Sequence, residues 1–186
     1  MKLQVIIGST RPGRVGLPVG QWFSEYARSH SDFDVAIADL AEINLPLYDE
    51  PLHPRLRKYQ NQHTKEWSAL IDAADALVIV TPEYNFAAPA TVINAIDYLS
   101  TEWKYKPVGL VSYGGVSAGT RAAQMLKQVV TTVGMMPLPE AVQIPFVTQF
   151  ITSEGVFQPN ELITQGADLM LAELTKWAQA LAPLRK

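Results

Sequence analysis

The chain has 186 residues, 48% of them hydrophobic, and a net charge of −3, which predicts one domain over residues 1–186 with a core of its own. It contains no cysteine, which excludes disulfides, thiolate metal sites and cysteine nucleophiles. The charge gives no sign of a nucleic-acid partner, and no apolar run has the length of a secretory signal or a membrane span, so we expect a cytoplasmic protein.

The chain begins with two apolar runs that enclose a helical segment. Leu3–Ile7 is short and β-branched, which predicts a buried strand, and Ser9–Gly16 follows it as a loop. Leu17–Ser29 has the apolar spacing of a helix, and Phe33–Leu40 predicts a second strand. This strand–helix–strand order is typical of a parallel βαβ unit.

The middle of the chain repeats the alternation after an irregular stretch. Pro46–Gln62 is polar and rich in proline, which predicts a loop, and Thr64–Ala74 returns to helical spacing. Ala76–Thr81 is apolar without alternation, as in a strand covered on both faces. The loop Pro82–Ala88 then leads into a helix predicted from Pro89 to about Leu99.

The last third supplies two more strands and two more helices. Val108–Tyr113 and Leu138–Ile144 predict strands, and Ser117–Val133 and Pro159–Leu181 predict helices. Alternating strands and helices of this number indicate an α/β fold, a doubly wound five-stranded parallel sheet with helices on both faces. Ligands bind such sheets at the carboxyl ends of the strands, where three unusual loops lie.

The first of these loops is dense in donors that suit a phosphate. Gly8-Ser-Thr-Arg-Pro-Gly-Arg-Val-Gly16 joins a strand to a helix N-terminus, whose free N–H groups and dipole favour an anion. The P-loop and dinucleotide fingerprints are absent, so a terminal monophosphate, such as that of FMN, fits best. The alternative is an ordinary turn with solvated arginines. The predicted phosphate contacts are Ser9, Thr10, Arg11, Arg14, Val15 and Gly16.

The second loop offers parts suited to a flat ring. Tyr84 presents an aromatic face, Asn85 has donor and acceptor atoms, and Pro82 stiffens the turn. We therefore predict that Pro82, Glu83, Tyr84 and Asn85 contact an isoalloxazine ring. Glu83 has two further interpretations, a cap on the following helix or a contact to a partner chain. The simpler alternative for the loop is a proline turn with a half-buried tyrosine.

The third loop contains a glycine pair that would expose backbone N–H groups. Ser112, Tyr113, Gly114 and Gly115 follow a buried strand, and donors there could stabilise the negative charge of a reduced flavin. The alternative is a pair of glycines that only makes a tight turn. The sequence shows no obvious acid–base dyad, so we name no catalytic residue, and the three histidines have no metal-ligand spacing.

Together the three loops resemble the motifs of the NAD(P)H-dependent FMN reductase family. Its GSxRxxS motif is matched by Gly8–Arg14, with Arg14 in place of the usual serine. The motif PEYN is complete at Pro82–Asn85, and PGxLKNAID reads PATVINAID from Pro89. A KPV strand start at Lys106–Val108 leads into the glycine-rich turn.

The resemblance implies a flavodoxin-like fold with non-covalent FMN and with NADPH or NADH as the electron donor. Hydride would pass through the flavin to a second flavin, a quinone, an azo compound or a similar small acceptor. Members of the family are usually dimers or tetramers, and the helix Pro89–Leu99 and the segment Trp103–Tyr105 are candidate interface pieces.

Two other protein classes share this topology. A flavodoxin-type electron carrier usually has an acidic face and a phosphate loop of Ser and Thr, whereas this chain has a net charge of only −3 and two arginines in the loop. A receiver-type signalling module needs acidic residues after the first and third strands, where Gly8-Ser9 and Thr81-Pro82 stand instead. The reductase is therefore the favoured interpretation, with the electron carrier as its alternative.

Overall fold

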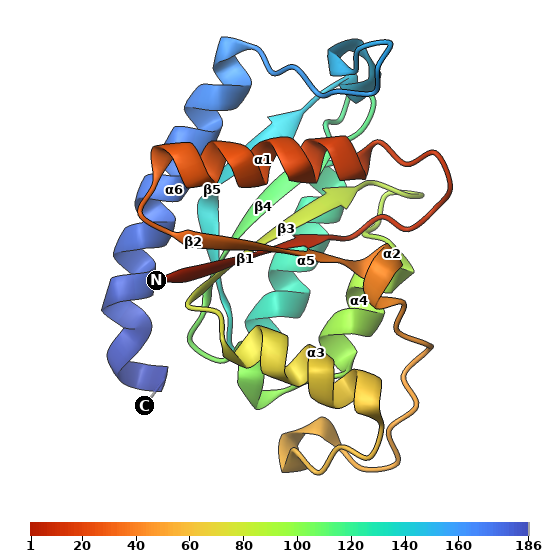
Figure 1. Cartoon of the computed structure of the whole chain (residues 1–186), viewed down its shortest axis with the longest axis vertical. Coiled ribbons are helices and arrows are strands. Elements are labelled where there is room, and N and C mark those ends of the chain that lie inside the picture. The colour runs from red at the N-terminus through yellow and green to blue at the C-terminus, as the bar shows by residue number, and fades with distance from the viewer. Residues whose placement is uncertain (186) are drawn as a thin grey trace.

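In a computed structural model, which describes residues 1–185, five strands form one parallel sheet with the order β2-β1-β3-β4-β5 (Figure 1). This order confirms the predicted doubly wound, flavodoxin-like sheet. The chain changes direction between β1 and β3, which makes their carboxyl ends the topological switch point. The strands are β1 (Lys2–Ile7), β2 (Asp34–Asp39), β3 (Ala76–Pro82), β4 (Pro107–Tyr113) and β5 (Met136–Ile144).

Helices cover both faces of the sheet. The helices α1 and α6 pack on one face, and α3, α4 and α5 pack on the other. Their bounds are α1 (Gly16–His30), α2 (Leu40–Ile43), α3 (Gln62–Asp72), α4 (Ala90–Asp97), α5 (Thr120–Thr132) and α6 (Glu161–Leu181). Short 3-10 turns occupy Pro54–Leu56, Thr101–Trp103, Val147–Phe150 and Ala182–Arg185. No helix within residues 1–185 has the length and apolar character to cross a membrane.

The two central strands are buried along their whole length. Every residue of β3 and β4 is buried, because helices cover these strands from both sides. Gly109 in β4 leaves room for α6, since a Cβ there would lie 2.6 Å from the Sδ of Met170. The edge strand β5 mixes buried and exposed residues. The sheet is thus a rigid platform that fixes the loops at its carboxyl edge.

Two details differ from the sequence predictions. The four-residue helix α2 follows β2 directly, and Asp39 caps it by accepting a hydrogen bond from the N–H of Ala41 at 3.0 Å. Trp103, a candidate interface residue, is 0% exposed, and its Nε1 donates to the carbonyl of Ile96. That side chain belongs to the core of its own chain, so Lys104 and Tyr105, which are both exposed, are the residues of this segment available to a partner.

Candidate functional site

The three predicted loops meet at the carboxyl edge of the sheet. The N–H of Gly8 donates to the carbonyl of Val80 at 2.9 Å, which joins the end of β1 to β3. Thr81 pairs with Ser112 in the register of β3 and β4. The loops 9–16, 83–89 and 114–119 therefore leave the sheet side by side, at the switch point where such folds bind ligands.

Ser9 holds a buried hydroxyl that has no partner. The residue is 0% exposed, and its Oγ makes no hydrogen bond of standard distance and angle with any described residue, although it lies close enough to the Tyr113 hydroxyl to lower the pKa of that group. A Cβ added at Gly16 would lie 2.2 Å from this oxygen and 2.3 Å from the Tyr113 hydroxyl. Glycine is therefore required at position 16, and the loop folds closely around two hydroxyl groups. An unpartnered buried hydroxyl is costly, which points to a ligand as its missing partner.

Helix α1 begins at this loop without a cap. Its N-cap residue is Val15, which makes no side-chain capping bond. Within the described chain, the N–H groups of Gly13, Val15 and Gly16 donate to no backbone carbonyl. Thr10 and Arg11 are exposed beside them. Free N–H groups at a helix N-terminus attract an anion, so the loop fits a phosphate.

Arg14 is held away from solvent by an acid at the end of β2. Its two terminal nitrogens donate to the carboxylate of Asp39 at 2.6 and 2.5 Å, and Nη1 also donates to the carbonyl of Ser9 at 2.7 Å. The side chain of Asp39 is 3% exposed. The Asp39 hydrogen bond raises the pKa of Arg14. Most of the donor capacity of Arg14 thus fixes the loop, and the exposed Arg11 is the freer cation.

The Tyr113 hydroxyl lies against the loop 9–16, close to Gly16. The residue is 3% exposed and belongs to the core. Burial raises the pKa of Tyr113; Ser9, Arg14 and Arg11 oppose this shift, and Tyr84 adds to it. These side chains come from the first and second loops, so Tyr113, at the start of the third, lies where the three loops meet.

The second loop forms a tight turn at the edge of the site. Tyr84 and Ala87 exchange two backbone hydrogen bonds of 2.9 Å, and Pro82 is the buried last residue of β3. Tyr84 is 37% exposed, and Asn85 is exposed with φ of 51°. The turn therefore presents both predicted ring contacts to the outside of the sheet edge.

Glu83 points along the edge toward α5. Its carboxylate accepts hydrogen bonds from the N–H of Arg121 at 3.0 Å, the Nε of Arg121 at 2.6 Å and the hydroxyl of Ser117 at 3.2 Å. Burial would raise the pKa of Glu83, but the bonds from Arg121 and Ser117 lower it below its usual value. Glu83 therefore caps α5, not the helix that follows it in the chain. The two helix N-termini at this edge therefore differ. The carboxylate of Glu83 caps α5, whereas no described side chain caps α1.

The third loop places its two glycines differently. The N–H of Gly114 donates to the carbonyl of Ile144 at 3.2 Å, so the prediction of a bare N–H is wrong for Gly114. The N–H of Gly115 donates to no described backbone carbonyl, and a Cβ at Gly115 would meet nothing within 4 Å. Ser112, beneath them, has a buried Oγ without a partner. The open space above Gly115 leaves room for a ring. The Ser112 hydroxyl below it has no partner among the described residues.

Three residues of the site were missed by the sequence predictions. Asp39 holds Arg14, Arg121 holds Glu83, and Phe146 lies next to Gly115, with its N–H donating to the Gly115 carbonyl at 3.0 Å. Asp39 could have been found, because it ends a predicted strand at the same edge of the sheet. The other two carry no local signal in the sequence.

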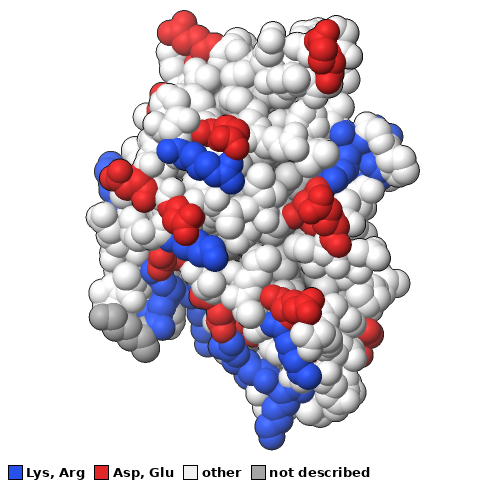
Figure 2. Space-filling view, in the orientation of Figure 1, with Lys and Arg blue, Asp and Glu red and all other residues white. Residues whose placement is uncertain are grey.

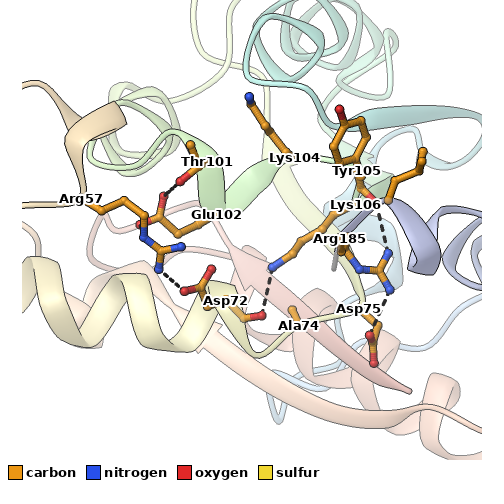
Figure 3. Close-up of a pocket in the computed structure, with 11 residues that line it drawn as sticks. Arg57, Asp72, Ala74, Asp75, Thr101, Glu102, Lys104, Tyr105, Lys106 and Arg185 are labelled. Atoms are coloured by element: carbon orange, nitrogen blue, oxygen red, sulfur yellow. Dashed lines mark hydrogen bonds and ion pairs between the residues drawn. The ribbon is translucent and has the colours of Figure 1, made fainter.

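A charged cavity of about 280 Å³ lies at the opposite edge (Figure 3). Lys106 precedes β4, and its Nζ donates to the carbonyls of Ile71 and Asp72 at the end of α3. Burial lowers the pKa of Lys106 to about 8. Around it, Arg57 pairs with Asp72, and Arg185 pairs with Asp75. These charges have partners, and the cavity lies at the amino ends of the strands, so it is not the predicted cofactor site.

The surface charges argue against an electron carrier. On the face drawn in Figure 2, Lys and Arg side chains lie interspersed with Asp and Glu. This face therefore carries no acidic patch of the kind that steers a carrier to its partner.

An open parallel sheet with an uncapped helix and unpaired hydroxyls at its switch point defines a nucleotide-binding α/β protein with a flavodoxin-like fold. The fold is shared with a flavoenzyme NAD(P)H:acceptor oxidoreductase from Paracoccus denitrificans, with a TM-score of 0.76 and 22% identity over 96% of this chain and 97% of that one.

Sequence comparison gives the family. The model of the NADPH-dependent FMN reductase family matches residues 1–149, so the chain belongs to that family. An NAD(P)H-dependent FMN reductase of Schizosaccharomyces pombe is 36% identical over 177 residues, covering 94% of this chain and 82% of the relative. An FMN-dependent NADPH-azoreductase of Staphylococcus aureus is 28% identical over 163 residues, covering 87% and 81%.

The predicted family, cofactor and enzyme class are thereby confirmed. The protein is an FMN-dependent oxidoreductase that takes its electrons from a nicotinamide nucleotide. The comparisons give no support to the electron-carrier alternative.

Proposed function

We propose that FMN binds at the carboxyl edge, with its phosphate on the loop 9–16 and its ring between the second and third loops. The observation that carries this proposal is the buried, unpartnered hydroxyl of Ser9 beside the uncapped start of α1. Ser9, Arg11 and the N–H groups of Val15 and Gly16 would hold the phosphate. Tyr84, Asn85 and Gly115 would contact the ring.

The chemistry supplied by bound FMN is transfer of two electrons between NAD(P)H and an acceptor. The chain's own contribution is binding and orientation. The uncapped α1 supplies a fixed positive potential for the phosphate, and the free N–H of Gly115 would favour negative charge on the reduced ring. Arg14 and Asp39 keep the phosphate loop in one conformation. No side chain has to act as an acid or a base.

The acceptor that best suits this edge is a flat, mainly apolar molecule such as a flavin, a quinone or an azo compound. Four apolar side chains are exposed around the three loops: Tyr84 at 37%, Phe86 at 67%, Val116 at 80% and Phe146 at 48%. Such a rim favours aromatic acceptors through apolar contact and ring stacking. The azoreductase among the relatives is consistent with this acceptor class.

A direct test follows the flavin absorbance. The purified protein is loaded with FMN, separated from free flavin and mixed with NADPH or NADH without oxygen. We expect the yellow absorbance to fade, and to return when a quinone, an azo dye or a free flavin is added. Protein that keeps FMN bound but does not bleach with either nucleotide would refute the reductase. The same mixtures rank the two donors and the acceptors.

We propose a homodimer or homotetramer in which the segment 46–56 and the adjacent α4 contact another copy. Leu47 is 83% exposed, Leu56 is 56% exposed and Leu52 is 39% exposed. A groove of about 910 Å³ lies between this segment and the ends of α4 and α5. Sedimentation of the wild type and of Leu47→Glu tests the interface. A monomeric wild type would contradict it, and an unchanged assembly in the variant would place it elsewhere.

Two broader proposals come from the sequence. We propose that residues 1–186 act as one domain, for which a single unfolding transition in urea is the test. We also propose a cytoplasmic location, and fractionation of cells that produce the tagged chain would test it.

A further inference from the structure

The turn that carries Tyr84 and Asn85 has a strained backbone. Asn85 has φ of 51° and Phe86 has φ of 68°, so both central residues of the two-residue turn are left-handed. This is the conformation of a type I′ turn, which favours Asn followed by Gly. Phe86 occupies the glycine position, where a side chain is costly. Other contacts must therefore stabilise the turn.

Arg121 supplies contacts from the first turn of α5. Its guanidinium carbon lies 3.8 Å from the centre of the Phe86 ring, within the range of a cation–π interaction. Its Nε donates to Glu83 at 2.6 Å, and Nη2 donates to the Ser117 hydroxyl at 2.8 Å. Arg121 thus contacts residues on both sides of Tyr84 and Asn85.

Glu83 completes the connection to the third loop. Its side chain is 7% exposed, while that of Arg121 is 46% exposed. The carboxylate accepts from Arg121 and from Ser117, which lies two residues after Gly115. The Glu83–Arg121–Phe86 clamp, as we name these three residues, therefore fixes the second loop against the start of α5 and the third loop.

We infer that Arg121 is a positioning residue that holds the strained turn at Phe86 so that Tyr84 and Asn85 face the flavin site. The inference rests on the proposed FMN site for its effect on binding, but the clamp itself belongs to the protein without cofactor. A lysine at position 121 could not make both contacts, because the bond to Glu83 and the stack on Phe86 both use the plane of the guanidinium group.

The test uses the glycine preference of the turn. In Phe86→Gly the turn is favoured by its own sequence, Asn-Gly, and no longer needs the clamp. We therefore expect Arg121→Ala to weaken FMN binding about tenfold in the wild-type background and less than about twofold in the Phe86→Gly background. FMN affinity is measured by quenching of flavin fluorescence with the cofactor-free protein. An equal loss in both backgrounds would overturn the inference.

Cleavage of the cofactor-free protein gives a second measurement that does not depend on FMN. Chymotrypsin cuts after Tyr84, a site that all variants retain, and mass spectrometry isolates this product. Arg121→Ala should speed this cleavage several-fold, and should not do so when Phe86 is Gly. Unchanged cleavage in Arg121→Ala would refute the clamp even if FMN bound normally. If the variants are cleaved as expected but the protein does not bind FMN, the proposed cofactor site is wrong and the clamp is not.

Two further variants make the result specific. Arg121→Lys keeps the charge and the helix propensity, and we expect it to behave like Arg121→Ala because it lacks the planar fork. If Arg121→Lys kept wild-type cleavage and FMN affinity, the positive charge alone would be sufficient, which would contradict the inference. Lys176→Ala removes the exposed ion pair with Glu173 on α6 and should change neither measurement.

Discussion

The two edges of the sheet differ in whether their buried polar groups have hydrogen-bond partners within the described chain. At the amino edge, Glu102 is 2% exposed and accepts hydrogen bonds from Tyr59 at 2.6 Å, Ser68 at 2.8 Å and the N–H of Ser100 at 3.2 Å. At the carboxyl edge, the hydroxyls of Ser9 and Ser112 are buried without partners. Buried charge with its partners present contributes to stability, whereas unmet hydroxyls at the switch point of the sheet fit a ligand as their partner.

The edges differ in whether their polar groups have partners. The cavity beside Lys106 is lined by the ion pairs Arg57–Asp72 and Arg185–Asp75. The proposed FMN site is recognised instead by polar groups that lack partners among the described residues. Changes at the two edges should therefore separate folding from cofactor binding, and the following variants test that separation.

The largest effect is expected at the amino edge. Glu102→Ala removes the acceptor of the buried Ser68 hydroxyl and of two partly buried donors, and should lower the free energy of unfolding by about 3 kcal/mol. Urea unfolding of the cofactor-free protein measures this loss, while FMN affinity should stay within about twofold. Glu25→Ala, which removes an exposed pair with Arg28, is the control. An equal loss of FMN affinity in Glu102→Ala would show that the edges are coupled.

At the carboxyl edge, Arg11→Ala should do the reverse. Removing an exposed cation beside the uncapped α1 should weaken FMN binding by about 1.5–3 kcal/mol, the range for a hydrogen bond to a charged group. The free energy of unfolding without FMN should not change. Titration of both proteins with FMN is the measurement, with Lys65→Ala as the removal of an exposed cation elsewhere, on α3. An unchanged dissociation constant would remove Arg11 from the phosphate site.

A smaller effect is expected above the third loop. Gly115→Val adds a side chain where a Cβ meets no protein atom within 4 Å, so the fold should tolerate it. The same bulk should occupy space meant for the ring and weaken FMN binding about tenfold. Flavin content after purification reports this, and Ala172→Val on the exposed side of α6 is the control. Full flavin content in Gly115→Val would show that the glycine only serves the turn.

The smallest effect is a pH dependence at the amino edge. Burial lowers the pKa of Lys106 to about 8, so above this pH the unfolded chain binds more protons than the folded one. Stability from this group therefore rises with pH above about 8, by about 1 kcal/mol between about pH 8 and pH 9, and this gain is lost as the pH falls back to about 8. Urea unfolding across this range should show the rise in the wild type and not in Lys106→Met. A rise of the same size in the variant would assign it to another group.

The sheet could be predicted from sequence because its central strands are buried on both faces. Ala76–Thr81 was predicted and Ala76–Pro82 is found, since a continuous apolar run leaves little choice of boundary. The helix α2 was missed because its four residues are too short to show a period. The end of α4 was placed two residues too late, at Leu99, because the apolar spacing continues past Asp97.

In the site, sequence could predict which loops meet but not which side chains pair across them. The partners Arg14 and Asp39 are 25 residues apart, and Glu83 and Arg121 are 38 apart. Local patterns carry no signal for such pairs. The same limit explains why the prediction for Gly114 was wrong, since its N–H donates to the carbonyl of Ile144 in the neighbouring strand.

The pairing of Arg14 with Asp39 also bears on how quickly the enzyme is assembled. Because these residues brace the loop 9–16 through contacts made within the chain itself, little conformational entropy should be lost when FMN binds at the proposed site. Stripped protein should recover its flavin in a single fast phase without a slow rearrangement.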